Sequence, residues 1–157
     1  MTAHVRPTVR IQAEDFDAGA EIAGMAAGRK DIGAVVSFSG LCRDEGGRLT
    51  ALELEHYPGM AEAEISRIAD EAMQRWPLTG VTVIHRHGLI APGANIVLVV
   101  TASAHRQTAF EAASFLMDYL KSRAPFWKKE HLADGAQGGW VDVKASDDKA
   151  AARWKTP

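Results

Sequence analysis

The sequence predicts a single domain of the α+β class, in which a mixed or antiparallel sheet packs against two long helices. Short segments with the apolar patterns of strands are interleaved with two long segments of helical period. Pairs of proline and glycine separate many of these segments, at places where turns are needed. The length of 157 residues and the apolar fraction of 46% are those of one globular domain with its own core, spanning residues 1–157.

The first third of the chain is predicted to form strands around one helix. Residues 5–12 have the pattern of an edge strand, and the acidic residues that follow favour a helix that ends near Gly28. Residues 32–40 have the composition of a buried strand, whereas residues 49–57 alternate apolar and charged side chains as a half-exposed strand does. The Pro58-Gly59 pair then ends this strand.

The two long helices are predicted from apolar side chains at helical spacing. Pro77 ends the first helix, and Pro125 stops the second, which runs from about residue 105 to residue 123. Strands at residues 81–87 and 96–102 lie between them, and the second strand is apolar enough for the centre of a sheet. The inward-facing residues are Ile65, Ile68, Ala69, Ala72, Met73 and Trp76 in the first helix and Ala113, Leu116, Met117 and Leu120 in the second.

The C-terminal part begins with an aromatic and basic segment after Pro125, which we expect to be extended. Glycines at residues 135–139 predict a loose loop, and a last strand follows near residues 140–143. A short terminal helix then carries Trp154. The chain contains no glycine signature of a dinucleotide-binding or phosphate-binding loop.

Charge and composition exclude several classes of function. A formal net charge of −2 provides no extended basic surface, so nucleic acid is not an expected partner. No apolar run reaches the roughly 18 residues that a membrane span requires, and the N-terminus lacks the apolar segment of a signal peptide. The single cysteine, Cys42, cannot form an internal disulfide. We therefore expect a cytoplasmic protein without a membrane partner.

The segment from Cys42 to Arg48 has the spacing of a cysteine phosphatase loop and loosely matches sulfurtransferase loops. Such a loop turns its backbone N–H groups inward and continues into a helix. Here Asp44 and Glu45 would repel an anion, and the sequence after Arg48 is strand-like. A cysteine at a strand end beside a hairpin loop is therefore favoured, and a Cys42-dependent persulfide sulfurtransferase or phosphatase is the alternative function.

His85 and His87 lie two residues apart on a predicted strand, so their side chains would share a face and could bind a metal ion. The sequence offers no evident third ligand. Two ordinary strand histidines are therefore favoured, and we predict no metal site.

Polar residues also stand at the start of the second long helix. His105 and Arg106 follow a strand that is predicted to be central, where free backbone N–H groups and side-chain cations would bind a phosphate. The alternative is that Ser103 caps the helix and both side chains are solvated.

The end of the same helix carries a cluster of positive charge. Residues 121–129 include four cations and no carboxylate, and they flank Phe126 and Trp127. Lysines in a last helical turn commonly interact only with the helix dipole and solvent. The whole cluster instead indicates a site for a small anionic ligand with a ring, in which Lys121 and Lys128 could serve as acid–base groups or amine nucleophiles.

Five long motifs occur in order along the chain: GAVVSFSG at residues 33–40, LEHYPGM at 54–60, VIHR at 83–86, SAHR at 103–106, and DYLKSRAPFWKKE at 118–130. Together they resemble the large, catalytic subunit family of molybdopterin synthase. The likeness extends from about residue 30 to residue 154.

The resemblance implies an α/β-hammerhead-like fold and a sulfur-transfer enzyme of molybdenum cofactor biosynthesis. In that family a small ubiquitin-like subunit ends in Gly-Gly with a C-terminal thiocarboxylate, which donates the sulfur. The acceptor is cyclic pyranopterin monophosphate (precursor Z), and two sulfur additions form the dithiolene of molybdopterin. Two large subunits form a dimer, and one small subunit at each end completes a heterotetramer. No cofactor or metal is expected.

The resemblance also assigns roles to residues of this sequence. Lys121 and Lys128 match the catalytic lysines, whereas the substrate-contacting positions fall on Arg43, His105, Arg106, Lys129 and Glu130. Leu41 replaces a lysine of a familiar member, which removes one cation from the expected pocket.

Lys144 replaces an arginine that is thought to reach the neighbouring subunit's pocket. It keeps the charge but loses the bidentate fork, and we expect it to bind substrate across the dimer. A second alternative function is a non-catalytic module that binds a ubiquitin-like protein.

Overall fold

The strands form two four-stranded sheets in the computed structural model, which describes residues 5–44, 46–133, 137–141 and 145–155. Sheet A has the order β1-β4-β6-β2, with β1 parallel to β4 and the other neighbours antiparallel. Sheet B has the order β5-β3-β7-β8 and is antiparallel throughout. The strands are β1 (Thr8–Gln12), β2 (Ala34–Leu41), β3 (Leu49–His56), β4 (Leu78–Arg86), β5 (Gly88–Ile90), β6 (Asn95–Ser103), β7 (Phe126–Leu132) and β8 (Gln137–Val141).

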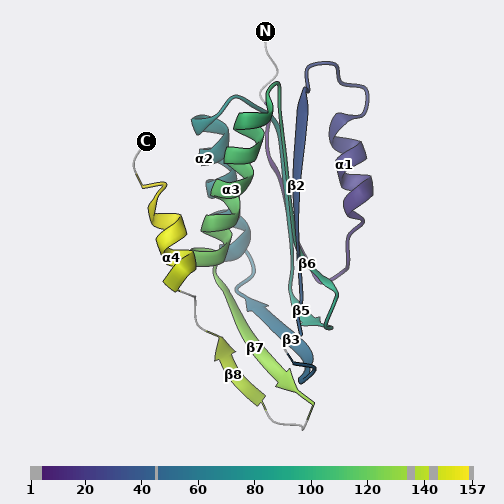
Figure 1. Ribbon diagram of the computed structural model, residues 1–157, viewed down its shortest axis with the longest axis vertical. Helices are drawn as coiled ribbons and strands as arrows, with labels where there is room; N and C mark the ends of the chain where they lie inside the picture. The colour runs from purple at the N-terminus through teal and green to yellow at the C-terminus, as the bar shows by residue number, and fades with distance from the viewer. Residues whose placement is uncertain (1–4, 45, 134–136, 142–144, 156–157) are drawn as a thin grey trace.

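Helices lie on both faces of sheet A. The long helices α2 (Met60–Arg75) and α3 (Arg106–Ser122) cover one face, and α1 (Ala18–Ala26) covers the other (Figure 1). The predicted α+β class with two long helices is therefore confirmed. The central strands β4 and β6 bury side chains on both faces, with Val81, Val83, Val97 and Val99 packed in the core with α2 and α3, and Ile84, Leu98 and Val100 packed with α1.

Several details of the sheets differ from the sequence prediction, which expected one sheet where the structure has two. The strand at residues 34–41 is an edge strand, in which Ser37, Phe38 and Ser39 are exposed, although its composition predicted a buried strand. Composition reports the size and polarity of side chains, whereas the number of neighbouring strands depends on pairing with distant residues. The three-residue strand β5 was not predicted, because so short a segment has no measurable period.

The chain passes from sheet A to sheet B between β4 and β5. Gly88 begins β5 with a φ of 95°, a backbone conformation that glycine adopts without the steric cost that a Cβ would add. The His87 amide donates to the carbonyl oxygen of Gln12 at 3.0 Å, which fixes this junction against the end of β1. His85 therefore stays in sheet A, whereas His87 lies at the joint between the sheets.

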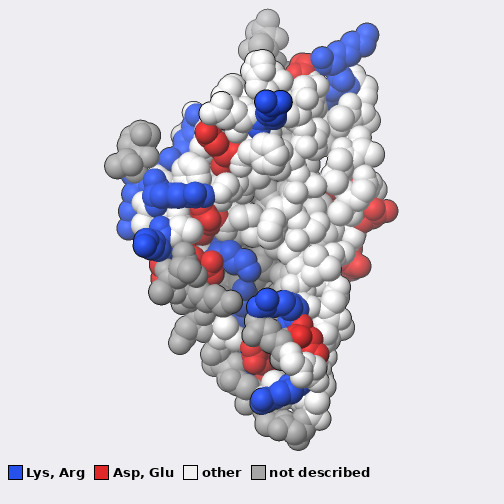
Figure 2. Space-filling view, viewed as in Figure 1, with Lys and Arg blue, Asp and Glu red and all other residues white. Residues whose placement is uncertain are grey.

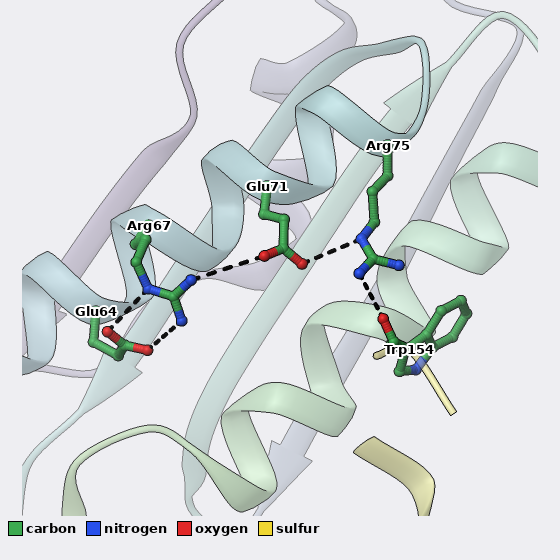
Figure 3. Close-up of polar contacts among 5 residues, drawn as sticks. All are labelled: Glu64, Arg67, Glu71, Arg75 and Trp154. Atoms are coloured by element: carbon green, nitrogen blue, oxygen red, sulfur yellow. Dashed lines mark hydrogen bonds and ion pairs between the residues drawn. The ribbon is translucent and has the colours of Figure 1, made fainter. Parts of the chain in front are cut away.

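Helix α4 (Ala145–Ala152) packs against α3, and Trp154 after it contacts both α3 and the end of α2. The indole of Trp154 donates to Asp118 on α3 at 2.6 Å, and its carbonyl oxygen accepts from Arg75 on α2 at 2.5 Å. Arg75 is also paired with Glu71, so a chain of charges along α2 ends at the C-terminal segment (Figure 3). Among the described residues, no helix is long and apolar enough to cross a membrane.

Phe115 on α3 provides a test of this packing. Its ring is fully buried and contacts Trp76, Tyr119 and Trp154, with Arg75 stacked over it at 4.9 Å. Phe115→Ala should lower the free energy of unfolding by about 3–5 kcal/mol because it leaves a cavity under three elements.

Phe110 on the same helix is 61% exposed and is the matched control. Phe110→Ala should change the free energy of unfolding by less than about 0.5 kcal/mol. Urea denaturation measures both values, and equal effects would contradict the proposed packing.

Candidate functional site

A cavity of about 770 Å³ lies where the two sheets meet the C-terminal end of α3. Figure 2 shows lysine and arginine side chains around a hollow in the lower half of the molecule. Within the described part of the chain, four cationic side chains line the cavity, Arg43, Arg48, Lys121 and Lys128, together with the carboxylates Glu130 and Asp147. The excess of positive charge favours an anionic ligand.

Lys121 and Lys128 reach the cavity because the chain reverses immediately after α3. The amides of Arg123 and Ala124 both donate to the carbonyl oxygen of Tyr119, which closes the helix tightly. Pro125 prevents the helix from continuing, and the extended strand β7 begins at the next residue. The last turn of α3 and the start of β7 therefore present one lysine each to the same space.

Strand alternation decides which residues of β7 face the cavity. Lys128 pairs with Leu54 and Glu130 pairs with Leu52, and Lys128, Glu130 and Leu52 all line the cavity. Lys129 lies between the two on the strand, opposite Glu53, so it faces the other side of sheet B. Of the three adjacent residues that the sequence assigned to the site, the structure brings Lys128 and Glu130 into the cavity and Lys129 to the opposite face.

His105 and Arg106 lie at the other end of α3, outside this cavity. His105 is the N-cap residue, and the 17-residue helix separates its two ends by about 25 Å at 1.5 Å per residue. Both side chains are exposed. One copy of the chain therefore does not bring His105 and Arg106 together with Lys121 and Lys128. The predicted residue Lys144 lies outside the described residues.

Arg48, His85 and Asp147 line the cavity, although the sequence did not predict them as substrate ligands or catalysts. Arg48 precedes β3 and adds a cation to the wall, and Leu41, at the end of β2, lies exposed at the same wall. The arginine was visible in the sequence only as part of the Cys42 loop. Pairing of β3 with β7 sets it opposite Ala133, whose amide donates to the Arg48 carbonyl oxygen, and its side chain lines the same cavity as Lys128.

His85 also lines the cavity, although the sequence considered it only as a possible metal ligand. It is 6% exposed, and its ring stacks on Phe126 with a centroid distance of 3.8 Å and an interplanar angle of 14°. Burial, together with the charges of Lys128 and Lys121, lowers the pKa of His85 to about 4. The hydrogen bond with the Arg86 carbonyl oxygen acts in the opposite direction but is smaller than the effect of burial. His85 is therefore a neutral imidazole at neutral pH.

The second histidine of the sequence pair has different neighbours. His87 lies against His56, with ring centroids 4.5 Å apart, and His56 in turn stacks on Phe126. Among the described residues, no three histidine, cysteine or carboxylate side chains are grouped so that they could hold a metal ion.

Cys42 borders the cavity but is poorly suited to nucleophilic chemistry. Its side chain is 2% exposed, and burial followed by the charge of Asp44 raises the pKa of the thiol. A reactive cysteine requires the thiolate, which this environment disfavours. The chain after Arg48 forms strand β3 rather than the helix that a phosphatase loop requires. These observations weigh against the Cys42-dependent alternative.

The remaining cavity wall is largely apolar, which suits a ligand that carries a ring. The apolar lining residues come from both sheets and from α3, and they include Leu49, Leu52, Ile96, Val97, Met117, Leu120, Phe126 and Leu132.

The chain is similar to proteins of known family over almost its whole length. The model of the family described as MoaE protein matches residues 11–123. A molybdopterin synthase catalytic subunit from Mesorhizobium japonicum is 74% identical over 99% of this chain and 98% of its own length. The solved structure of a molybdopterin biosynthesis MoaE protein from Burkholderia ambifaria is 48% identical, with a TM-score of 0.81, and the match covers 96% of this chain and 99% of that one. The crystal structure of molybdopterin synthase from Staphylococcus aureus is 31% identical, with a TM-score of 0.75, over 85% of this chain and 96% of that one.

The buried histidine gives a pH-dependent prediction. The pKa of His85 is about 4 in the fold and 6.5 in an unfolded chain, so the unfolded chain binds the proton first as the pH falls. The contribution of neutral His85 to stability is complete above pH 6.5, is lost progressively down to pH 4, and amounts to about 3 kcal/mol.

The free energy of unfolding of wild type minus that of His85→Asn should therefore fall by about 3 kcal/mol between pH 7 and pH 4. Urea denaturation at a series of pH values measures this difference. A difference that stays constant with pH would mean that His85 is solvated in the folded protein.

Proposed function

The chain belongs to the MoaE protein family and is an enzyme of molybdenum cofactor biosynthesis, the catalytic subunit of a molybdopterin synthase, and we propose that it transfers sulfur from a partner's C-terminal thiocarboxylate to precursor Z. The partner in this proposal is a small ubiquitin-like subunit that ends in Gly-Gly. The observation that carries the proposal is the convergence of Lys121 and Lys128, from α3 and β7, on one cationic cavity.

Both proposed substrates fit the charge and shape of the cavity. The thiocarboxylate and the cyclic phosphate are anions, and Arg43 and Arg48 supply fixed positive charge beside the two lysines. The pterin ring can pack on the apolar wall, and the Gly-Gly tail is narrow enough to enter beside it because it has no side chains. Glu130 adds an acceptor for the donor groups of the pterin.

We divide the chemistry into two stages. First, the thiocarboxylate sulfur forms a bond to an oxygen-bearing side-chain carbon of the pterin, while a carbon–oxygen bond at that carbon breaks and its electron pair leaves on the oxygen. This substitution joins the two substrates through an acyl–sulfur adduct. Water then adds to the acyl carbon, the carbon–sulfur bond to the partner breaks, and the partner leaves as a carboxylate while the sulfur stays on the pterin. A second partner molecule repeats both stages to complete the dithiolene.

The lysines act where negative charge develops. In this proposal Lys121 lies against the terminal carbonyl of the partner and stabilises the oxyanion that forms when water adds. Lys128 holds the pterin or transfers a proton to it. Fixed cations in a partly apolar cavity are effective in this role because little solvent reorganises around them.

His105 and Arg106 fit the proposal if the enzyme is a dimer. They are separated from the cavity of their own chain by the length of α3, so a second copy would have to supply them to bind the phosphate. A dimer of this chain with one small subunit at each end gives the heterotetramer that the family resemblance implies. The role of Lys144 across the dimer stays a prediction.

Removal of either cavity lysine should abolish most of the activity. Lys121→Ala and Lys128→Ala should each reduce the rate of dithiolene formation by about 10²–10³-fold, because each removes a cation that faces the developing charge. The measurement is a reconstitution with thiocarboxylated partner and precursor Z.

Two controls accompany this measurement. Lys30→Ala removes an exposed lysine outside the cavity and should leave the rate unchanged. Cys42→Ala should also retain activity, because the sulfur arrives on the partner. Loss of activity in Cys42→Ala with full activity in the lysine variants would favour a persulfide enzyme, and a wild type that binds the partner without turnover would favour a binding module.

Mixing two inactive variants tests the shared site. Dimers mixed from Arg106→Ala and Lys121→Ala chains would contain one intact site, formed by Lys121 of one copy and Arg106 of the other. Random exchange should restore about a quarter of the wild-type activity, because half of the dimers are mixed and half of their sites are intact. No recovery after verified subunit exchange would place Arg106 in a different role.

A further inference from the structure

His85 occupies the cavity but has no part in the chemistry above. It lies on β4 of sheet A, on the same side as the core residues Val81 and Val83, and its ring covers Phe126 at the start of β7. One face of the imidazole stacks on Phe126, and the surrounding protein leaves only 6% of the residue exposed. Its position is therefore well defined relative to Lys128, two residues further along β7.

The hydrogen bond of the ring fixes which nitrogen carries the proton. Nδ1 lies 2.8 Å from the carbonyl oxygen of Arg86, an atom that only accepts hydrogen bonds. Nδ1 must therefore be the protonated nitrogen, and in the neutral ring Nε2 keeps its lone pair. Burial and the charges of Lys128 and Lys121 keep the ring neutral by lowering the pKa of His85 to about 4.

The cavity thus combines two kinds of group that hydrolysis of an acyl adduct requires. The lysines provide positive charge for the oxyanion and for the sulfur that departs, but a protonated lysine does not accept a proton from water. The carboxylates Glu130 and Asp147 also line the cavity, and Glu130 is the competing acceptor. His85 differs from both in being neutral, buried and fixed in orientation.

We propose that Nε2 of His85 is the proton acceptor for the water that hydrolyses the acyl–sulfur adduct, an inference that rests on the proposed function. The water oxygen bonds to the acyl carbon while one water proton moves to Nε2. The bond between the acyl carbon and the sulfur then breaks, and its electron pair stays on the sulfur as a thiolate beside the lysine ammonium groups. The imidazolium returns its proton to the thiolate or to solvent, which restores neutral His85.

The experiment separates formation of the adduct from its hydrolysis. The enzyme is mixed with thiocarboxylated partner and precursor Z in a single turnover, and the covalent partner–pterin adduct and the dithiolene are followed by mass spectrometry. In His85→Asn the amide can still donate to the Arg86 carbonyl oxygen, but no group remains to accept a proton at the position of Nε2. We expect the adduct to form at the wild-type rate and to decay about 10²-fold more slowly, so that it accumulates.

Matched variants make the result specific. His87→Asn changes the histidine two residues away, whose ring packs against His56 outside the cavity, and it should hydrolyse the adduct at the wild-type rate. His85→Gln is the second variant if His85→Asn does not fold, and thermal unfolding with partner binding establishes that either variant is intact.

Several outcomes would overturn the inference. They are adduct decay at the wild-type rate in His85→Asn and His85→Gln, equal slowing of adduct formation and decay, or accumulation of adduct in Glu130→Gln but not in the His85 variants. A wild-type enzyme that forms neither adduct nor dithiolene would instead contradict the proposed function itself.

Discussion

The stacking of Phe126 on His85 is the contact on which the geometry of the site depends. It joins β7 of sheet B to β4 of sheet A, with ring centroids 3.8 Å apart, at the point where the chain has just left α3. Because Phe126 is anchored there, the register of β7 against β3 is fixed from its first residue, and Lys128 and Glu130 face the cavity. The same contact buries the imidazole and keeps it neutral.

The lining of the cavity explains why some of its titratable side chains are neutral whereas others stay charged. Apolar side chains from both sheets and from α3 exclude water from part of the wall, which strengthens the effect of each fixed charge. That environment favours the neutral forms of His85 and Cys42, whose pKa values are lowered and raised respectively. Arginine remains charged in any such setting, so Arg43 and Arg48 give the cavity its permanent positive character.

Much of the fold followed from local patterns in the sequence. The apolar faces of α2 and α3 and the alternation in β3 have periods that short segments reveal, and Pro77 and Pro125 mark helix ends because proline cannot continue a helix. The edge position of β2 and the division of the strands into two sheets were not predictable in this way. Both depend on hydrogen bonds between residues that are far apart in the sequence.

The sequence by itself determined the order of the elements, the cluster of cations after α3 and the resemblance that assigned Lys121 and Lys128. Only the tertiary structure decided which of the candidate residues share a cavity. The rigid length of α3 keeps His105 and Arg106 away from Lys121, although all three belong to neighbouring motifs. Alternation along β7 turns Lys129 away from the cavity, and pairing of β3 with β7 brings Arg48 to it. The reason is that a side chain's direction follows from its own backbone, whereas its neighbours are set by the packing of distant elements.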